Sequence, residues 1–265
     1  MGKILAITNQ KGGVGKTTSS VNLAASLAAS GKRVLLLDLD PQGNATMGSG
    51  VNKHNLDKSM YHVLTGRSPL EDVICRGEGV EFDVLPSNAD LTAAEVEMMT
   101  MDNKESILKH VLETVLDKYD FILIDCPPSL NMLTVNAMVA ARGVIIPMQC
   151  EYYALEGLTA LMDTITGIRK TINPDLHIEG LLRTMYDPRT SLTTEVSRQL
   201  ISHFGDQVYK TVIPRNIRLA EAPSHGKPVL AYDKNSRGAI AYLALAGELL
   251  KKHESGLAGK KTGMR

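Results

Sequence analysis

The chain has 265 residues, of which 43% are hydrophobic and 22% are charged. This length is sufficient for one large α/β domain with its own core, and no apolar run approaches the roughly 20 residues that span a bilayer. The three cysteines have no paired spacing, which excludes a disulfide framework and favours a reducing, cytoplasmic compartment.

The charges balance over the whole chain but not along it. The 29 Lys and Arg match 29 Asp and Glu, which by itself argues against a nucleic-acid partner. Residues 176–265, however, carry 14 Lys and Arg against 8 Asp and Glu, a net charge of +6, and residues 1–175 have a net charge of −6. The basic C-terminal third is compatible with a polyanionic partner, although so mild an asymmetry is also typical of a solvated surface.

A glycine-rich loop lies between a predicted strand and a predicted helix near the N-terminus. Residues 3–8 (KILAIT) form a short apolar run that predicts a buried strand, and residues 17–29 place small and apolar side chains on one helical face. Glycines let backbone N–H groups turn towards an anion, and the helix N-terminus adds its own free N–H groups. The loop between them, NQKGGVGKTT at 9–18, therefore predicts a phosphate-binding site.

This loop departs from the usual Gly-x4-Gly-Lys-Thr pattern. Gln10 stands where the first glycine is expected, and a second lysine, Lys11, precedes the glycines. Lys16 supplies a positive charge for the β- and γ-phosphates, and Thr17 offers a hydroxyl to Mg²⁺. We assign nucleotide binding to Gly12, Gly13, Val14, Gly15, Lys16, Thr17 and Thr18.

Two further apolar runs end in acidic residues. Residues 32–37 (KRVLLL) predict a strand buried on both faces, followed by Asp38 and Asp40, which point to opposite sides of an extended chain and so cannot share one role. Residues 119–125 (YDFILID) predict another buried strand, whose terminal Asp125 is placed to hold a metal ion. Carboxylates at such strand ends lie where open α/β sheets bind ligands.

The rest of the chain alternates between predicted strands and helices. We expect short helices and turns over 44–75, strands over 82–86, 143–149, 176–184 and 208–213, and helices over 88–101, 105–118, from about 157 to 170, and over 192–204 and 237–253. Cys126 follows the strand predicted over 119–125 and Cys150 the strand predicted over 143–149, and both are expected to be buried. The alternation predicts one α/β domain over residues 1–253 and a disordered basic tail over 254–265.

The motifs together resemble one family. The loop resembles the deviant Walker A motif (KGGxGKT) of the ParA/MinD family of dimeric ATPases, and the likeness extends to DLDPQGN at 38–44, DCPPS at 125–129 and PRNIRLAEAPSHG at 214–226. It is that of a short ParA (Soj-type) chromosome- or plasmid-partitioning ATPase. The resemblance implies a single-domain P-loop NTPase fold, a mostly parallel twisted sheet with helices on both faces, and ATP and Mg²⁺ as cofactors.

The resemblance also implies residue roles. Lys11 would cross a dimer interface to the partner's nucleotide, Lys16 would act on the phosphates, and Asp40 would position the attacking water. Thr17, Asp38 and Asp125 would arrange Mg²⁺. Contacts to the base are implied for Met185, Pro214, Arg215 and Asn216, and contacts to DNA for Arg189 and Arg218.

The implied partners are a second copy of the chain when ATP is bound, non-specific double-stranded DNA, and a ParB-type protein that stimulates a weak ATPase at the nucleoid. A MinD-like membrane-associated regulator is an alternative, although GLAGKK at 256–261 lacks the apolar face of a membrane helix. A metabolic ATPase of the same loop class is a second alternative. The nitrogenase iron protein shares the loop and bridges its subunits with an iron–sulfur cluster, but the two cysteines per subunit that it needs, in their local patterns, are not found here.

Overall fold

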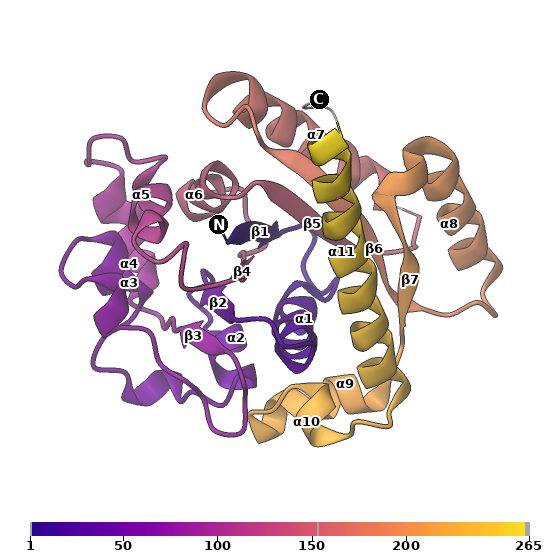
Figure 1. Cartoon of the computed structure of the whole chain (residues 1–265), viewed down its shortest axis with the longest axis horizontal. Helices are drawn as coiled ribbons and strands as arrows, with labels where there is room; N and C mark the ends of the chain where they lie inside the picture. Colours follow the sequence, from indigo (N-terminus) through magenta and orange to yellow (C-terminus); the bar gives the residue numbers. More distant parts are fainter. Residues whose placement is uncertain (1, 153, 263–265) are drawn as a thin grey trace.

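The sheet organises the molecule. The computed structural model describes residues 2–152 and 154–262, and within them the strands form one seven-stranded parallel sheet in the order β3-β2-β4-β1-β5-β6-β7 (Figure 1). The strands are β1 (Lys3–Ile7), β2 (Val34–Asp38), β3 (Asp83–Leu85), β4 (Phe121–Asp125), β5 (Gly143–Gln149), β6 (His177–Tyr186) and β7 (Val208–Pro214). The predicted parallel α/β fold is confirmed.

Helices cover both faces of this sheet. One face packs against α1 (Lys16–Ala29), α9 (Ile217–Glu221), α10 (Val229–Tyr232) and α11 (Arg237–Thr262). The other packs against α3 (Met60–Leu64), α4 (Leu91–Met98), α5 (Ile107–Glu113), α6 (Met132–Ala140), α7 (Ala154–Thr171) and α8 (Ser191–Phe204). The short α2 (Asn44–Gly48) follows β2, and single 3₁₀ turns lie at Lys53–Asn55, Leu70–Asp72, Gly205–Gln207 and Ala222–His225.

The strands are apolar on both faces because two separate cores use them. Along β1, Ile4 and Ala6 join one hydrophobic cluster, whereas Leu5 and Ile7 join the other. All five residues of β2 and of β4 are buried. Such continuous apolar runs are what a parallel sheet with helices on both sides requires. They explain why the strand positions were predictable.

Helix ends differ more from the prediction. The helix expected over 105–118 ends at Glu113, and turns continue to Lys118. Neighbouring Thr114 and Val115 are β-branched, which weakens a helix there. The last helix continues to Thr262 rather than ending near His253, since residues 257–261 contain the helix-favouring Leu, Ala and Lys. The disorder expected over 254–265 stays a prediction, and residues 263–265 lie outside the described part of the chain.

The parallel arrangement brings the candidate residues together. All strands point the same way, so the loops after β1, β2, β4, β5, β6 and β7 emerge at one edge of the sheet. Asp38 and Asp125 are register partners at the ends of β2 and β4. Cys126 and Cys150 are buried at this edge, as predicted. Among residues 2–152 and 154–262, no helix has both the length and the apolar character to cross a membrane.

Candidate nucleotide-binding site

The glycine loop between β1 and α1 has the backbone of an anion cradle. Gly13 and Gly15 have φ values of 73° and 86°, in the left-handed region that glycine enters at little cost. Gly15 precedes the first turn of α1, and no side chain caps it. The first N–H groups of α1 are thus available to an anion, and no acidic residue in that turn opposes one.

Lys16 is held within this cradle. The residue is 7% exposed, and its Nζ donates a hydrogen bond to the Lys11 carbonyl oxygen at 3.2 Å. Burial lowers the pKa of Lys16, while the nearby charge of Asp125 raises it. An anion placed in the loop would therefore restore to this ammonium the favourable charge environment that burial removes.

Asp125 meets the start of α1 at the end of β4. Its Oδ2 accepts a hydrogen bond from Thr17 Oγ1 at 2.8 Å, and its Oδ1 accepts one from Ser20 Oγ at 2.7 Å. Burial, and then the charge of Asp38, raise the pKa of Asp125. Oxygen donors beside a buried carboxylate are the set that Mg²⁺ prefers, so the residues present fit this cation. Ser20 was missed by the sequence analysis, although it lies one turn after Thr17 on the same helix.

Asp38 and Asp40 occupy different environments, as their spacing predicted. Asp38 is fully buried, and its oxygens accept hydrogen bonds from Asp40 N (3.2 Å), Thr46 N (2.7 Å) and Thr46 Oγ1 (2.7 Å). Burial raises the pKa of Asp38, and the Thr46 bonds lower it. Asp40 is half-buried and accepts a bond from Gln42 N at 2.9 Å. The charge of Asp40 contributes to raising the pKa of both Lys16 and Asp125.

Lys11 lies at the outer rim of the loop. Its Nζ forms an ion pair with Glu151 Oε2 at 2.8 Å, and the two side chains are 42% and 50% exposed. A Cβ added to the neighbouring Gly12 would meet no atom of the chain within 4 Å. The rim of the loop is thus open, and Glu151 anchors Lys11 to the segment that follows β5.

A cavity of about 180 Å³ extends the cradle towards β6 and β7. It brings together the four residues assigned to the base, Met185, Pro214, Arg215 and Asn216, and places them beside Gly15 and Thr18. Met185 has a φ of 47°, uncommon for a side chain of this kind, and its Sδ accepts a bond from Gln149 Nε2 at 2.7 Å. Backbone strain of this sort is typical of functional sites.

Other residues of this cavity were not predicted. Thr184 is buried and donates through Oγ1 to the Val14 carbonyl oxygen at 2.8 Å, which ties the end of β6 to the loop. Tyr242 of α11 also lines the cavity, and its hydroxyl lies 3.1 Å from Ser19 Oγ. Neither position carries a recognisable motif, because each contributes through contacts that join distant parts of the chain.

Comparison with known proteins identifies the family. A family model described as an AAA domain matches residues 2–178. The sporulation initiation inhibitor protein Soj of Bacillus subtilis is 54% identical over 249 residues, which cover 94% of this chain and 98% of that protein. The chromosome partitioning protein ParA of Caulobacter vibrioides is 50% identical over 252 residues, covering 94% of each chain. The chain belongs to the ParA/Soj family of chromosome-partitioning ATPases.

Solved structures share the fold of this ParA/Soj chain. The cell division ATPase MinD of Pyrococcus furiosus superposes with a TM-score of 0.79 at 29% identity, over 95% of this chain and 99% of that one. A cobyrinic acid a,c-diamide synthase of Mycobacterium smegmatis, with bound ADP and magnesium, has a TM-score of 0.85 at 37% identity, over 97% of each chain. The predicted P-loop ATPase architecture is thereby confirmed.

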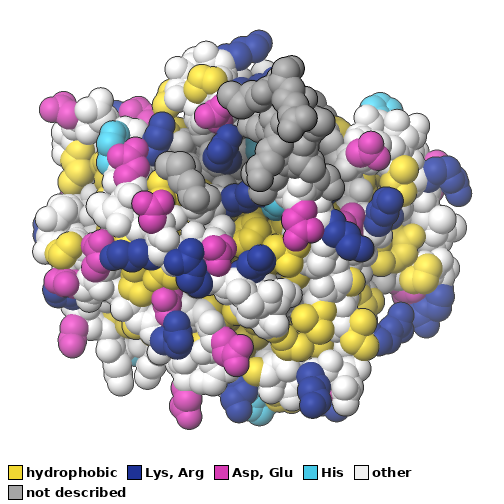
Figure 2. Space-filling view, in the orientation of Figure 1, with side chains coloured by type: hydrophobic (Ala, Val, Ile, Leu, Met, Phe, Trp, Pro, Cys, Tyr) yellow, Lys and Arg dark blue, Asp and Glu magenta, His cyan; other side chains and the backbone are white. Residues whose placement is uncertain are grey.

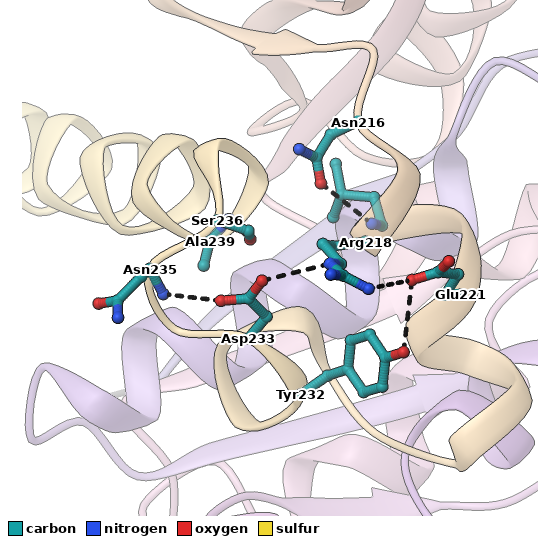
Figure 3. A network of polar contacts seen from close by, with 9 residues as sticks. Asn216, Arg218, Glu221, Tyr232, Asp233, Asn235, Ser236 and Ala239 are labelled. Atoms are coloured by element: carbon teal, nitrogen blue, oxygen red, sulfur yellow. Dashed lines mark hydrogen bonds and ion pairs between the residues drawn. The ribbon is translucent and has the colours of Figure 1, made fainter.

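The two arginines that the ParA resemblance assigned to DNA are both exposed and both paired. Arg189 precedes α8 and forms an ion pair with Asp187 at 2.7 Å. Arg218 of α9 lies between Glu221 at 2.8 Å and Asp233 at 3.3 Å (Figure 3). Figure 2 shows several Lys and Arg side chains along the right-hand edge of the molecule, over α8 and β7. A phosphate at either arginine would have to compete with these carboxylates.

Proposed function

We propose that this ParA/Soj protein is an ATP-dependent DNA-segregation ATPase. In this proposal ATP and Mg²⁺ binding closes a homodimer, the dimer binds duplex DNA without sequence specificity, and slow hydrolysis stimulated by a ParB-type protein releases it. The observation that carries the proposal is a phosphate cradle with one lysine folded inside it and a second lysine at its open rim. The affinity for DNA would place the ATP-bound dimer at the nucleoid.

The proposed nucleotide contacts divide along the loop. Backbone N–H groups of residues 12–18 and the Lys16 ammonium would bind the phosphates. Thr17 and Asp125 would hold Mg²⁺, with Asp38 supporting the segment beside them, and the ion would neutralise charge on the β- and γ-phosphates. Met185, Pro214 and Arg215 would pack against the base and ribose. The Asn216 amide, whose Oδ1 accepts a bond from Leu219 N at 3.3 Å, would read the base edge through its nitrogen.

The open rim is proposed as the dimer surface. Lys11 would leave Glu151 and reach the partner's nucleotide. The exposed ion pair that is lost contributes about 0–1 kcal/mol to stability, and contacts to phosphate in a closed interface would replace it. Apart from the two adjacent residues, a Cβ built on Gly12 would meet no atom of its own chain within 4 Å, so packing within the subunit does not require a glycine there. A partner's backbone close to Gly12 would account for it.

Replacing Gly12 by valine tests the dimer. A Cβ built on Gly12 meets no atom within 4 Å, so Gly12→Val should fold and keep its ATP affinity within about threefold. It should nevertheless stay monomeric, because the methyl groups block the partner. Light scattering with ATP measures this directly. Gly167→Val is the matched control, since a Cβ there also meets no atom within 4 Å, and it should dimerise as the wild type does. A Gly12→Val protein that dimerises normally would contradict the proposed interface.

DNA binding is proposed for the exposed arginines Arg189 and Arg218. Contacts of this kind are made to phosphates, so binding would be independent of sequence and sensitive to salt. Dimerisation would double the number of arginines that face one duplex, which explains how nucleotide state could control DNA affinity without any base contact. The paired carboxylates Asp187, Glu221 and Asp233 would keep the affinity of the monomer low.

A MinD-like membrane role remains the alternative to test beside this one, because MinD shares the fold. Pelleting with anionic vesicles in the presence of ATP distinguishes the two. The proposal expects the protein to remain in the supernatant and to pellet with DNA-coated beads instead.

A further inference from the structure

Four residues form a closed ring of hydrogen bonds next to the phosphate loop. Asp38 accepts from Asp40 N at 3.2 Å and from Thr46 Oγ1 at 2.7 Å. Thr46 Oγ1 in turn accepts from Ser87 N at 2.9 Å. Ser87 Oγ closes the ring by donating to the Asp40 carbonyl oxygen at 3.1 Å. The ring thus joins the end of β2, the short helix α2 and the loop that follows β3.

The ring is buried except at the residue that would act on water. Asp38, Thr46 and Ser87 are each 0% exposed, whereas Asp40 is half-buried. Hydrogen bonds to a buried carboxylate are shorter and stronger than neutral ones, and removing one partner leaves a buried group unsatisfied. Three inaccessible residues therefore fix the main chain on both sides of one accessible carboxylate.

The turn after Asp40 has no space for a side chain at Gly43. Gly43 has a φ of 60°, and a Cβ built on it would lie 2.7 Å from the Ser87 carbonyl oxygen. Gly43 N also donates to the Asp40 carbonyl oxygen at 2.9 Å, the same atom that Ser87 Oγ contacts. Ser87 thus lies against the turn through both its hydroxyl and its carbonyl oxygen.

We propose that Thr46 and Ser87 are positioning residues for ATP hydrolysis. Neither residue contacts the nucleotide or the attacking water. Both hold the Asp40 main chain so that the Asp40 carboxylate is placed to contact that water. The inference rests on the proposed role of Asp40. A displacement of a reacting group by about 1 Å can reduce a rate about 10²-fold, so a ring that fixes the backbone matters for turnover more than for binding.

The test compares two substitutions at one position. Thr46→Val keeps the shape of the side chain but removes the hydroxyl that joins Asp38 to Ser87, whereas Thr46→Ser keeps the hydroxyl. We expect Thr46→Val to lower single-turnover hydrolysis at saturating ATP about tenfold or more, with ATP affinity unchanged within about twofold. The ATP-bound dimer, followed by light scattering, should persist longer in the same proportion. Thr46→Ser should restore both the rate and the dimer lifetime, and Ser87→Ala should behave as Thr46→Val does.

Different failures have different meanings. If Thr46→Val hydrolyses ATP at the wild-type rate, or if it loses ATP affinity and dimer together, the positioning role is overturned. If Ser87→Ala and Thr46→Ser are equally slow, the ring is not what sets the rate. A wild-type protein that forms no ATP-dependent dimer would instead overturn the proposed function, which the same light-scattering traces reveal before any variant is compared.

Discussion

Asp40→Ala is expected to reduce ATP hydrolysis by about 10²-fold or more while ATP affinity changes within about threefold, because a positioned base contributes about 10²–10⁴-fold to a rate. The substitution keeps the main-chain bonds of residue 40 to Asp38 and Ser87, so the loop stays in place and only the carboxylate is lost. Because we propose that hydrolysis opens the dimer, we expect the variant to accumulate as an ATP-bound dimer. Light scattering after ATP addition measures this.

Asp40→Asn serves as the matched control for shape. It can still accept the bond from Gln42 N, but its amide is not basic. We expect it to hydrolyse ATP as slowly as Asp40→Ala does. An Asp40→Ala dimer that dissociates as fast as the wild type after ATP addition would contradict the role given to this residue.

Lys16→Ala should lose nucleotide binding. The Lys16 ammonium is buried within the cradle, where contacts between a cation and phosphate are strong, and we expect ATP affinity to fall about 10²-fold or more. Because burial lowers the pKa of Lys16, the folded protein holds this charge at a cost, and its removal should not lower the thermal unfolding midpoint. Titration with a fluorescent ATP analogue measures the loss.

Lys11→Ala is the matched control from the same loop. Its side chain is 42% exposed and paired with Glu151, so its loss should leave the nucleotide affinity of the monomer within about threefold but prevent dimerisation. Equal losses of ATP affinity in Lys16→Ala and Lys11→Ala would contradict the proposal that Lys16 binds the nucleotide of its own subunit and Lys11 acts only in the dimer.

The strands were predictable because their physical cause is local. Residues 143–149 were predicted as a strand and form β5 with the same limits, and the runs that became β2 and β4 are buried throughout. Helix α5 was predicted too long, because apolar periodicity continues through Val115 and Leu116 while the backbone already turns. The periodicity of apolar residues indicates which face of a helix is buried, but not the residue at which its backbone hydrogen bonds end.

The site was predictable where a motif is contiguous and not where it depends on long-range contacts. The loop at 9–18 and Asp125 follow from sequence alone. The sequence marks Asp38 as an acid at a strand end, but not its bonds to Thr46, nor the contact of Thr46 with Ser87, which is 41 residues further along the chain. The pairing of Arg218 with Asp233 likewise cannot be predicted from the sequence, because it depends on the packing of α9 against the end of α10 (Figure 3).

The central claim is that ATP switches this protein into a DNA-binding state. Binding of a random-sequence duplex, followed by fluorescence anisotropy at about 50 and 200 mM salt with ATP or ADP, tests it most directly. We predict binding with ATP alone, weaker at high salt and reduced about tenfold in Arg218→Glu. Arg67→Glu is the control, because Arg67 is similarly exposed at 47% and paired with Glu97. It follows α3, which packs on the opposite face of the sheet from α9. Equal binding with ADP, or no binding in either state, would contradict the account.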